Sequence, residues 1–198
     1  MKEVRKIVRA ILRENNATRI AFVNTFKEKY GDMEEIGQTR TGALFRDSSG
    51  TIVKLTSDKS EYDNALHFIK KPHKNFIKYY SAEPLEVGDE TWYVLYMEEI
   101  KELGDDDWAV VDMINNTLGT QDYMLDDQRR YSFIAELKRN PEWYEDIASY
   151  KEIIKTLQDI YTMYKEAARR GIRLHDARSQ NMGRTNDGRL VHFDIGAG

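Results

Sequence analysis

The chain has 198 residues, of which 40% are hydrophobic and 11% aromatic. This is enough apolar side chain to bury a core, which argues against a disordered chain. The formal charge is only -4, from 30 basic and 34 acidic residues, so nucleic-acid binding over the whole surface and an acidic tail are both unexpected. The sequence has no cysteine, which excludes disulfides, thiolate metal sites and a cysteine nucleophile.

Charged residues interrupt every apolar stretch of the chain. No run approaches the ~20 apolar residues of a membrane-spanning helix, and the charged start does not resemble the apolar core of a signal peptide. We therefore expect a cytoplasmic protein with no membrane partner.

Two helical patterns open the chain. Over residues 4–12 apolar residues recur at helical spacing, with basic residues on the other faces. We expect this helix to pack by its apolar face, with the charged face in solvent. The second pattern ends at Gly31, where a helix C-cap is expected. Its apolar positions are Ile20, Val23, Phe26 and Tyr30.

The next segment has strand periodicity. Residues 33–56 are typical of three short strands, and residues 60–71 return to a helical pattern. Aromatic and β-branched runs over 75–83 and 91–100 predict two more strands, with a turn region around Pro84 and Gly88. The sequence thus predicts a five-stranded unit with one inserted helix.

The second half is mainly helical. Helical patterns cover residues 104–120, 121–139 and 150–171, and the last of them is the strongest. A closing hairpin is predicted from residues 181–185 and 189–195, around the turn Asn186-Asp187-Gly188. The fold class is therefore α+β. We expect a helical extension over 1–31, a sheet-rich domain over 32–100 and a helical domain over 101–198.

The end of the chain carries the clearest chemical motif. In HDARSQN, Asp176 is followed five residues later by Asn181, and the later segment HFDIG contains Asp194. Phosphoryl transfer needs a carboxylate beside the attacking hydroxyl and oxygen ligands for magnesium. Aspartate and asparagine in loops also serve as turn formers and caps, but their order here favours the chemical role.

The first half offers matching groups. Lys54 ends the strand TIVKL, and Glu61 is the only glutamate on the helix that follows. Upstream, EIGQTRTGALF places Gly37 and Gly42 at two positions of a glycine-rich loop, with Thr39 where a middle glycine would stand. A strand lysine, a helix glutamate and a glycine-rich loop are the parts that hold ATP phosphates in kinases.

Together these motifs resemble the protein-kinase-like superfamily over residues 34–198. The resemblance implies a two-lobed fold, with a small antiparallel-sheet lobe, a reduced helical lobe and extra N-terminal helices. It also implies an ATP site between the lobes and a need for Mg2+. Some bacteriophage-encoded serine/threonine kinases look similar, which would place the protein in a host cytoplasm.

The resemblance also implies roles for individual residues. Asp176 would orient and deprotonate the substrate hydroxyl, Arg178 would contact the transferred phosphate, and Asn181 and Asp194 would hold Mg2+. Lys54, braced by Glu61, would place the ATP phosphates. Gly37 and Gly42 would cover the phosphates, and the adenine would meet the backbone of the connecting segment, at Glu98, Glu99 and Ile100.

Three functions are compatible with these features. The first is a protein kinase acting on protein hydroxyls, serine or threonine rather than tyrosine, with host proteins as substrates if the chain is phage-encoded. The second is a small-molecule phosphotransferase of the aminoglycoside or choline kinase type, favoured by His175 directly before Asp176. The third is an inactive kinase-like protein that binds and inhibits a partner, favoured by the missing middle glycine and the missing activation segment.

Overall fold

This computed structural model describes residues 18, 20–31, 33–39, 42–119, 121–172, 174 and 179–193. The predicted helix over residues 4–12 lies outside them. Among the described residues, no helix has the length and apolar character needed to cross a bilayer.

The first described helix covers residues 20–30 and ends at Gly31, as predicted. Gly31 has a φ of 84°, and its N–H donates to the carbonyl of Lys27 at 2.9 Å. Of the predicted apolar positions, Phe26 is buried and Val23 and Tyr30 pack against the same cluster, but Ile20 is 55% exposed and Phe22 is buried instead. Ile20 lies about 200° around the helix from Phe22, so one face cannot bury both.

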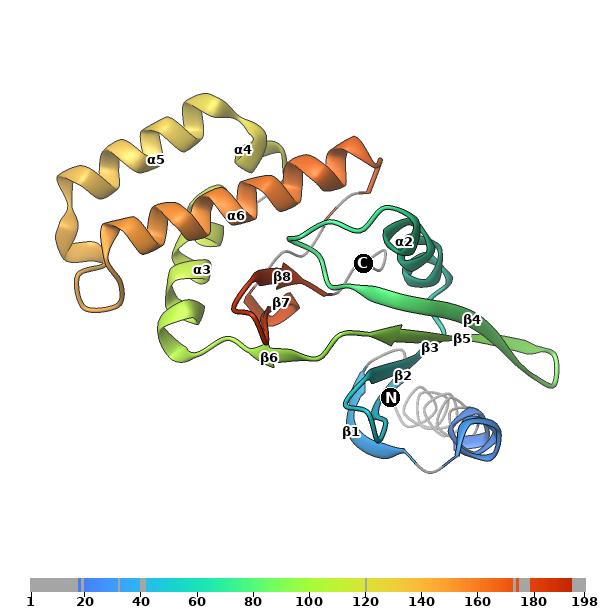
Figure 1. Ribbon diagram of the computed structural model, residues 1–198. Coiled ribbons are helices and arrows are strands. Elements are labelled where there is room, and N and C mark those ends of the chain that lie inside the picture. Colours follow the sequence, from blue (N-terminus) through green and yellow to red (C-terminus); the bar gives the residue numbers. More distant parts are fainter. Residues whose placement is uncertain are drawn as a thin grey trace, which may run out of the picture.

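The predicted five-stranded sheet is confirmed (Figure 1). All its neighbours are antiparallel, and the strand order is β1-β2-β3-β5-β4. The inserted helix α2 (Lys59–Lys70) also forms, with the side chain of Asp58 accepting hydrogen bonds from the amides of Ser60 and Glu61 at its N-terminus. The strands are β1 (Glu34–Thr39), β2 (Gly42–Arg46), β3 (Ile52–Thr56), β4 (Tyr79–Val87) and β5 (Glu90–Met97).

Both faces of this sheet are covered. Val53 and Leu55 of β3 belong to an apolar cluster with Phe22 and Phe26 of the first helix. Ile52, on the opposite face of the same strand, joins a second cluster with Ala65 and Phe68 of α2 and the helical half of the chain. Every residue of β3 is therefore buried, which is why a charged side chain on this strand must find a partner within the protein.

Pro84 lies inside β4, opposite Tyr93, rather than in the turn where we expected it. The turn is confined to Gly88, with a φ of 63°, and its neighbour Asp89. A proline has no N–H to donate to a ladder, and it is tolerated here because β4 is the edge strand of the sheet.

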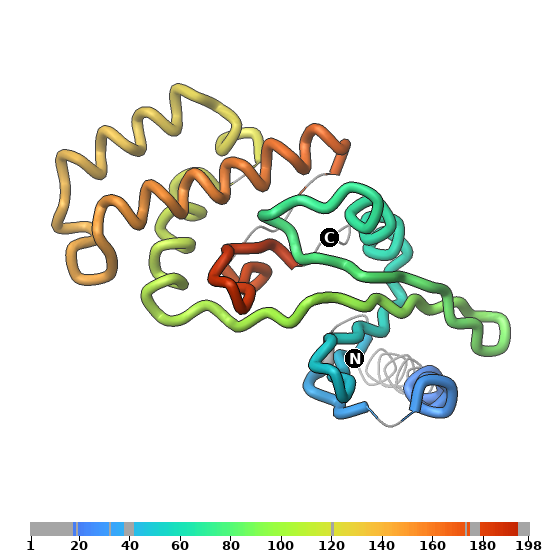
Figure 2. The backbone as a smooth tube through the Cα atoms, viewed as in Figure 1, coloured from blue at the N-terminus to red at the C-terminus, as the bar shows by residue number. Residues whose placement is uncertain are grey.

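The second half begins with a strand that the sequence did not predict. This strand, β6 (Ile100–Glu102), pairs with β7 (Met182–Thr185), which in turn pairs with β8 (Leu190–His192) in the predicted hairpin. Figure 2 shows the hairpin between β6 and the long helix α6 (Tyr150–Arg169). The three-stranded sheet therefore joins the residues after β5 to the end of the chain.

Helices fill the remainder of the second half. α3 (Asp105–Leu118) follows the first prediction, but the second predicted helix is divided into α4 (Gln121–Leu125) and α5 (Asp127–Arg139). The break occurs because Asp126 caps α5, accepting hydrogen bonds from the amides of Gln128 and Arg129. Short 3-10 turns, η1 (Pro141–Trp143) and η2 (Ser179–Asn181), precede α6 and β7.

The C-terminal turn of α6 carries a charge cluster. Glu166 accepts hydrogen bonds from Arg169 at 2.7 and 2.8 Å and from Arg170 at 2.6 Å. The bonds from Arg169, followed by those from Arg170, lower the pKa of Glu166 to about 2. Because the pKa is lower in the folded state, the cluster stabilises the fold fully above about pH 5, and this contribution is lost as the pH falls towards 2.

We predict that Glu166→Gln lowers the free energy of unfolding at pH 7 by roughly 1 to 3 kcal/mol. The difference from the wild type should shrink as the pH falls from 5 to 3, because the Glu166 carboxylate of the unfolded wild type binds a proton in this range while that of the folded protein, with a pKa of about 2, stays ionised. Urea unfolding at several pH values measures this. Glu136→Gln, which removes an exposed ion pair with Arg139, is the control and should cost less than about 1 kcal/mol. A loss that does not change with pH would contradict the charge-based explanation.

Candidate active site

Lys54 and Glu61 form a buried ion pair. The ammonium of Lys54 lies 2.5 Å from a carboxylate oxygen of Glu61, and the two residues are only 8% and 1% exposed. Strand alternation turns Lys54 towards α2, and the cap at Asp58 starts that helix so that Glu61 lies in its first turn. The structure thus brings together the two residues that the sequence predicted to pair.

Lys54 of this pair lies in the wall of a cavity of about 440 Å³ between the five-stranded and three-stranded sheets. Most of its lining is apolar, and the remaining residues are polar or charged. The residues come from the first three strands, from the connection between the sheets, and from the C-terminal hairpin with η2. The cavity is lined by Ile36, Leu44, Arg46, Ile52, Lys54, Ile77, Met97, Glu98, Glu99, Ile100, Glu102, Leu103, Trp108, Ser179, Gln180, Met182 and Phe193.

The two predicted loop glycines differ in their surroundings. A Cβ at Gly42 would lie 1.7 Å from the carbonyl oxygen of Leu55, whereas one at Gly37 would meet only Leu44, at 3.8 Å. Gly42 is therefore required by the close approach of β3. The side chains that line the cavity here are those of Ile36, next to Gly37, and Leu44.

The connection after β5 lines the cavity at all three predicted positions, Glu98, Glu99 and Ile100. The Glu98 N–H already makes a hydrogen bond within the protein, because it donates to the carbonyl of Lys78 at 2.9 Å. This N–H therefore does not take part in the predicted contact between an adenine and the backbone of the segment, and the contact itself stays a prediction. The Glu99 carboxylate accepts a hydrogen bond from Arg46 at 2.8 Å, which ties the connection to β2.

The opposite wall is formed by η2 and the start and end of the hairpin. Ser179 donates to Asp112 of α3 at 2.5 Å, which anchors η2. The N–H of Phe193 donates to the carbonyl of Asn181 at 3.0 Å, so the residue preceding Asp194 is held beside Asn181. Asp176, Arg178 and Asp194 themselves lie outside the described residues.

Several cavity residues were not among the predicted site residues. Arg46 and Trp108 belong to no short motif, and Ser179 lies within HDARSQN but was given no role; the three reach the cavity because β2, α3 and η2 converge on it. Among the described residues, no group of three or more histidine, cysteine, aspartate or glutamate side chains is placed to hold a metal ion. Of the two predicted metal ligands, only Asn181 is described.

Comparison with known proteins adds no relative. No protein-family model matches the chain, and no curated protein matches its sequence significantly. The function must therefore be argued from the geometry of the cavity and from the motifs beside it.

The contrast between the two glycines can be tested by substitution. We predict that Gly42→Ala lowers the free energy of unfolding by roughly 3 kcal/mol, because the new methyl group would clash with the Leu55 carbonyl. Gly37→Ala is the matched control and should cost less than about 1 kcal/mol. Thermal unfolding of both variants measures the difference, and equal losses would contradict the packing role of Gly42.

Proposed function

We propose that the protein is an ATP- and magnesium-dependent phosphotransferase of the protein-kinase type. The observation that carries this proposal is that Lys54, which lines the 440 Å³ cavity, forms a buried ion pair with Glu61. A buried ion pair adds little net stability compared with apolar packing, so stability alone gives weak reason for placing a lysine there. A strand lysine paired with a helix glutamate is what kinases use to place ATP phosphates.

The cavity has the chemistry that a nucleotide needs. Its volume falls within the range of small-molecule sites, and its apolar residues suit a flat base. Leu44 and Ile52 come from the sheet side and Met182 from the hairpin side, so a base could lie between them. Lys54 then provides a positive charge for phosphate oxygens at the inner wall.

Asn181 and Asp194 supply the oxygen donors that magnesium prefers. The hydrogen bond from Phe193 to Asn181 supports their joint use, because it holds the two ends of the hairpin together. When bound, the metal ion would neutralise charge on the transferred phosphate. In this proposal Asp176 accepts the proton of the attacking hydroxyl and Arg178 contacts the phosphoryl group.

The two sheets support the two-lobed arrangement that this function requires. The five-stranded sheet with α2 carries Lys54 and Glu61, whereas the three-stranded sheet and its helices carry Asn181 and the segment before Asp194. Residues 98–100 connect the two parts and line the cavity between them. We propose protein serine and threonine hydroxyls as the acceptors.

The function is tested with purified protein, γ-labelled ATP, Mg2+ and a bacterial lysate. We predict that the wild type labels proteins and that Asp194→Ala reduces labelling by about 100-fold or more, because a magnesium ligand is lost. Labelling of a small cationic acceptor but of no protein would instead indicate a small-molecule phosphotransferase. Absence of any transfer by folded wild-type protein would overturn the proposal.

The role of Lys54 is tested separately from its effect on stability. Lys54→Met removes the cation beside the buried carboxylate of Glu61, which destabilises the fold, so Lys54→Met/Glu61→Gln is made beside it. We predict that both variants lose about 100-fold in kcat/KM for ATP and that the double variant is the more stable of the two. Lys59→Met, on the exposed side of the same helix, is the control and should keep its activity. Unchanged kcat/KM in the double variant would remove Lys54 from the mechanism.

A further inference from the structure

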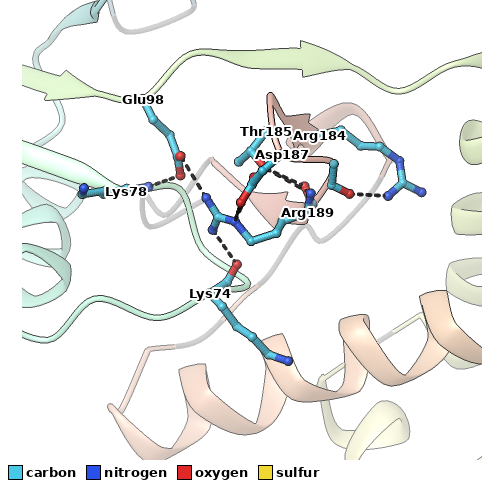
Figure 3. A network of polar contacts seen from close by, with 8 residues as sticks. Lys74, Lys78, Glu98, Arg184, Thr185, Asp187 and Arg189 are labelled. Carbon is cyan, nitrogen blue, oxygen red and sulfur yellow. Dashed lines mark hydrogen bonds and ion pairs between the residues drawn. The ribbon is translucent and has the colours of Figure 1, made fainter.

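Arg189, at the start of β8, lies at the centre of a polar network that none of the roles above uses (Figure 3). Its guanidinium donates to the carboxylate of Asp187 at 2.8 Å, to the carbonyl of Lys74 at 3.0 Å and to Glu98 at 3.0 Å. These partners belong to the hairpin turn, the loop after α2 and the connection after β5. One side chain thus joins three segments that are far apart in the sequence.

Glu98 also contacts Lys78, the residue directly before β4. One carboxylate oxygen of Glu98 accepts from Arg189, and the other accepts from the N–H of Lys78 at 2.8 Å. The side chains of Glu98 and Arg189 are only 14% and 34% exposed, so this pair is better shielded than an ordinary surface pair. The planar guanidinium also holds its several acceptors at fixed angles.

Further along β8, backbone hydrogen bonds join the strand to the same loop. The N–H of His192 donates to the carbonyl of Asn75, and the N–H of Ile77 donates to the carbonyl of His192, both at 3.1 Å. Arg189 thus fixes the turn end of β8 to the segment that follows α2, and the backbone fixes the other end. This segment follows the helix that carries Glu61, so the attachment connects the hairpin to the Lys54–Glu61 side of the cavity.

We propose that Arg189 is a positioning residue, which sets the β7–β8 hairpin, and with it Asn181, relative to the Lys54–Glu61 pair. This inference rests on the proposed phosphotransfer. Arg189 touches none of the reacting atoms in this arrangement. A hairpin that shifts would misplace Asn181, while Leu44 and Ile52 on the sheet side of the nucleotide site stay in place, so catalysis is affected more than nucleotide binding.

The test compares Arg189→Ala and Arg189→Lys with Arg184→Ala. Arg184 is the matched control because it lies on the same hairpin at similar exposure but pairs with Asp107 of α3, within the same half of the molecule. We expect Arg189→Ala to lower kcat about tenfold while the KM for ATP changes less than about threefold. Arg189→Lys should recover part of the loss, and Arg184→Ala should keep kcat within about threefold.

Hydrogen–deuterium exchange gives a readout that does not depend on activity. In Arg189→Ala the amides of Ile77 and His192 should exchange faster than in the wild type, and in Arg184→Ala they should not. An active wild type with an unchanged kcat in Arg189→Ala, or an equal loss in Arg184→Ala, overturns the positioning role while the proposed function stands. Folded wild-type protein that transfers no phosphate overturns the proposed function, and the positioning role with it.

Discussion

The charges of Lys54 and Glu61 lie 2.5 Å apart where little water reaches either side chain. Removing Lys54 or Glu61 would take the opposite charge away from a buried group, at a cost of several kcal/mol. The two side chains can contact each other only if β3 is paired on both sides and Asp58 caps α2, so that the first turn of the helix faces the strand. The position of the helix, the wall of the cavity and the proposed phosphate site all depend on this contact.

Much of the fold could be predicted because its signals are local. Alternating apolar residues and the turns at Gly50 and Gly188 identify the strands, and helical spacing identifies α2 and α6. One position of the first helix was wrong: Phe22, which stacks on Trp92, is buried in place of Ile20, and this contact with a distant strand has no local signal. The short strand β6 was missed because only its pairing with β7 defines it.

The candidate site shows the same division between local and distant information. Lys54 and Glu61 could be predicted because a strand and the next helix in the chain present them to each other. The steric need for a glycine at position 42 could not be predicted, because it comes from the backbone of a neighbouring strand. The contact between Glu98 and Arg189 joins residues 91 positions apart and has no sequence pattern that would reveal it.

Pro84 affects whether copies of this protein can associate through the edge of the five-stranded sheet. A strand at the edge of a sheet presents unpaired backbone groups, to which a strand of another molecule can add. β4 is such an edge and is nine residues long, and the proline removes one N–H donor from its middle. The sheet tolerates a proline only on an edge strand. The same proline therefore makes this edge strand a poor template for aggregation.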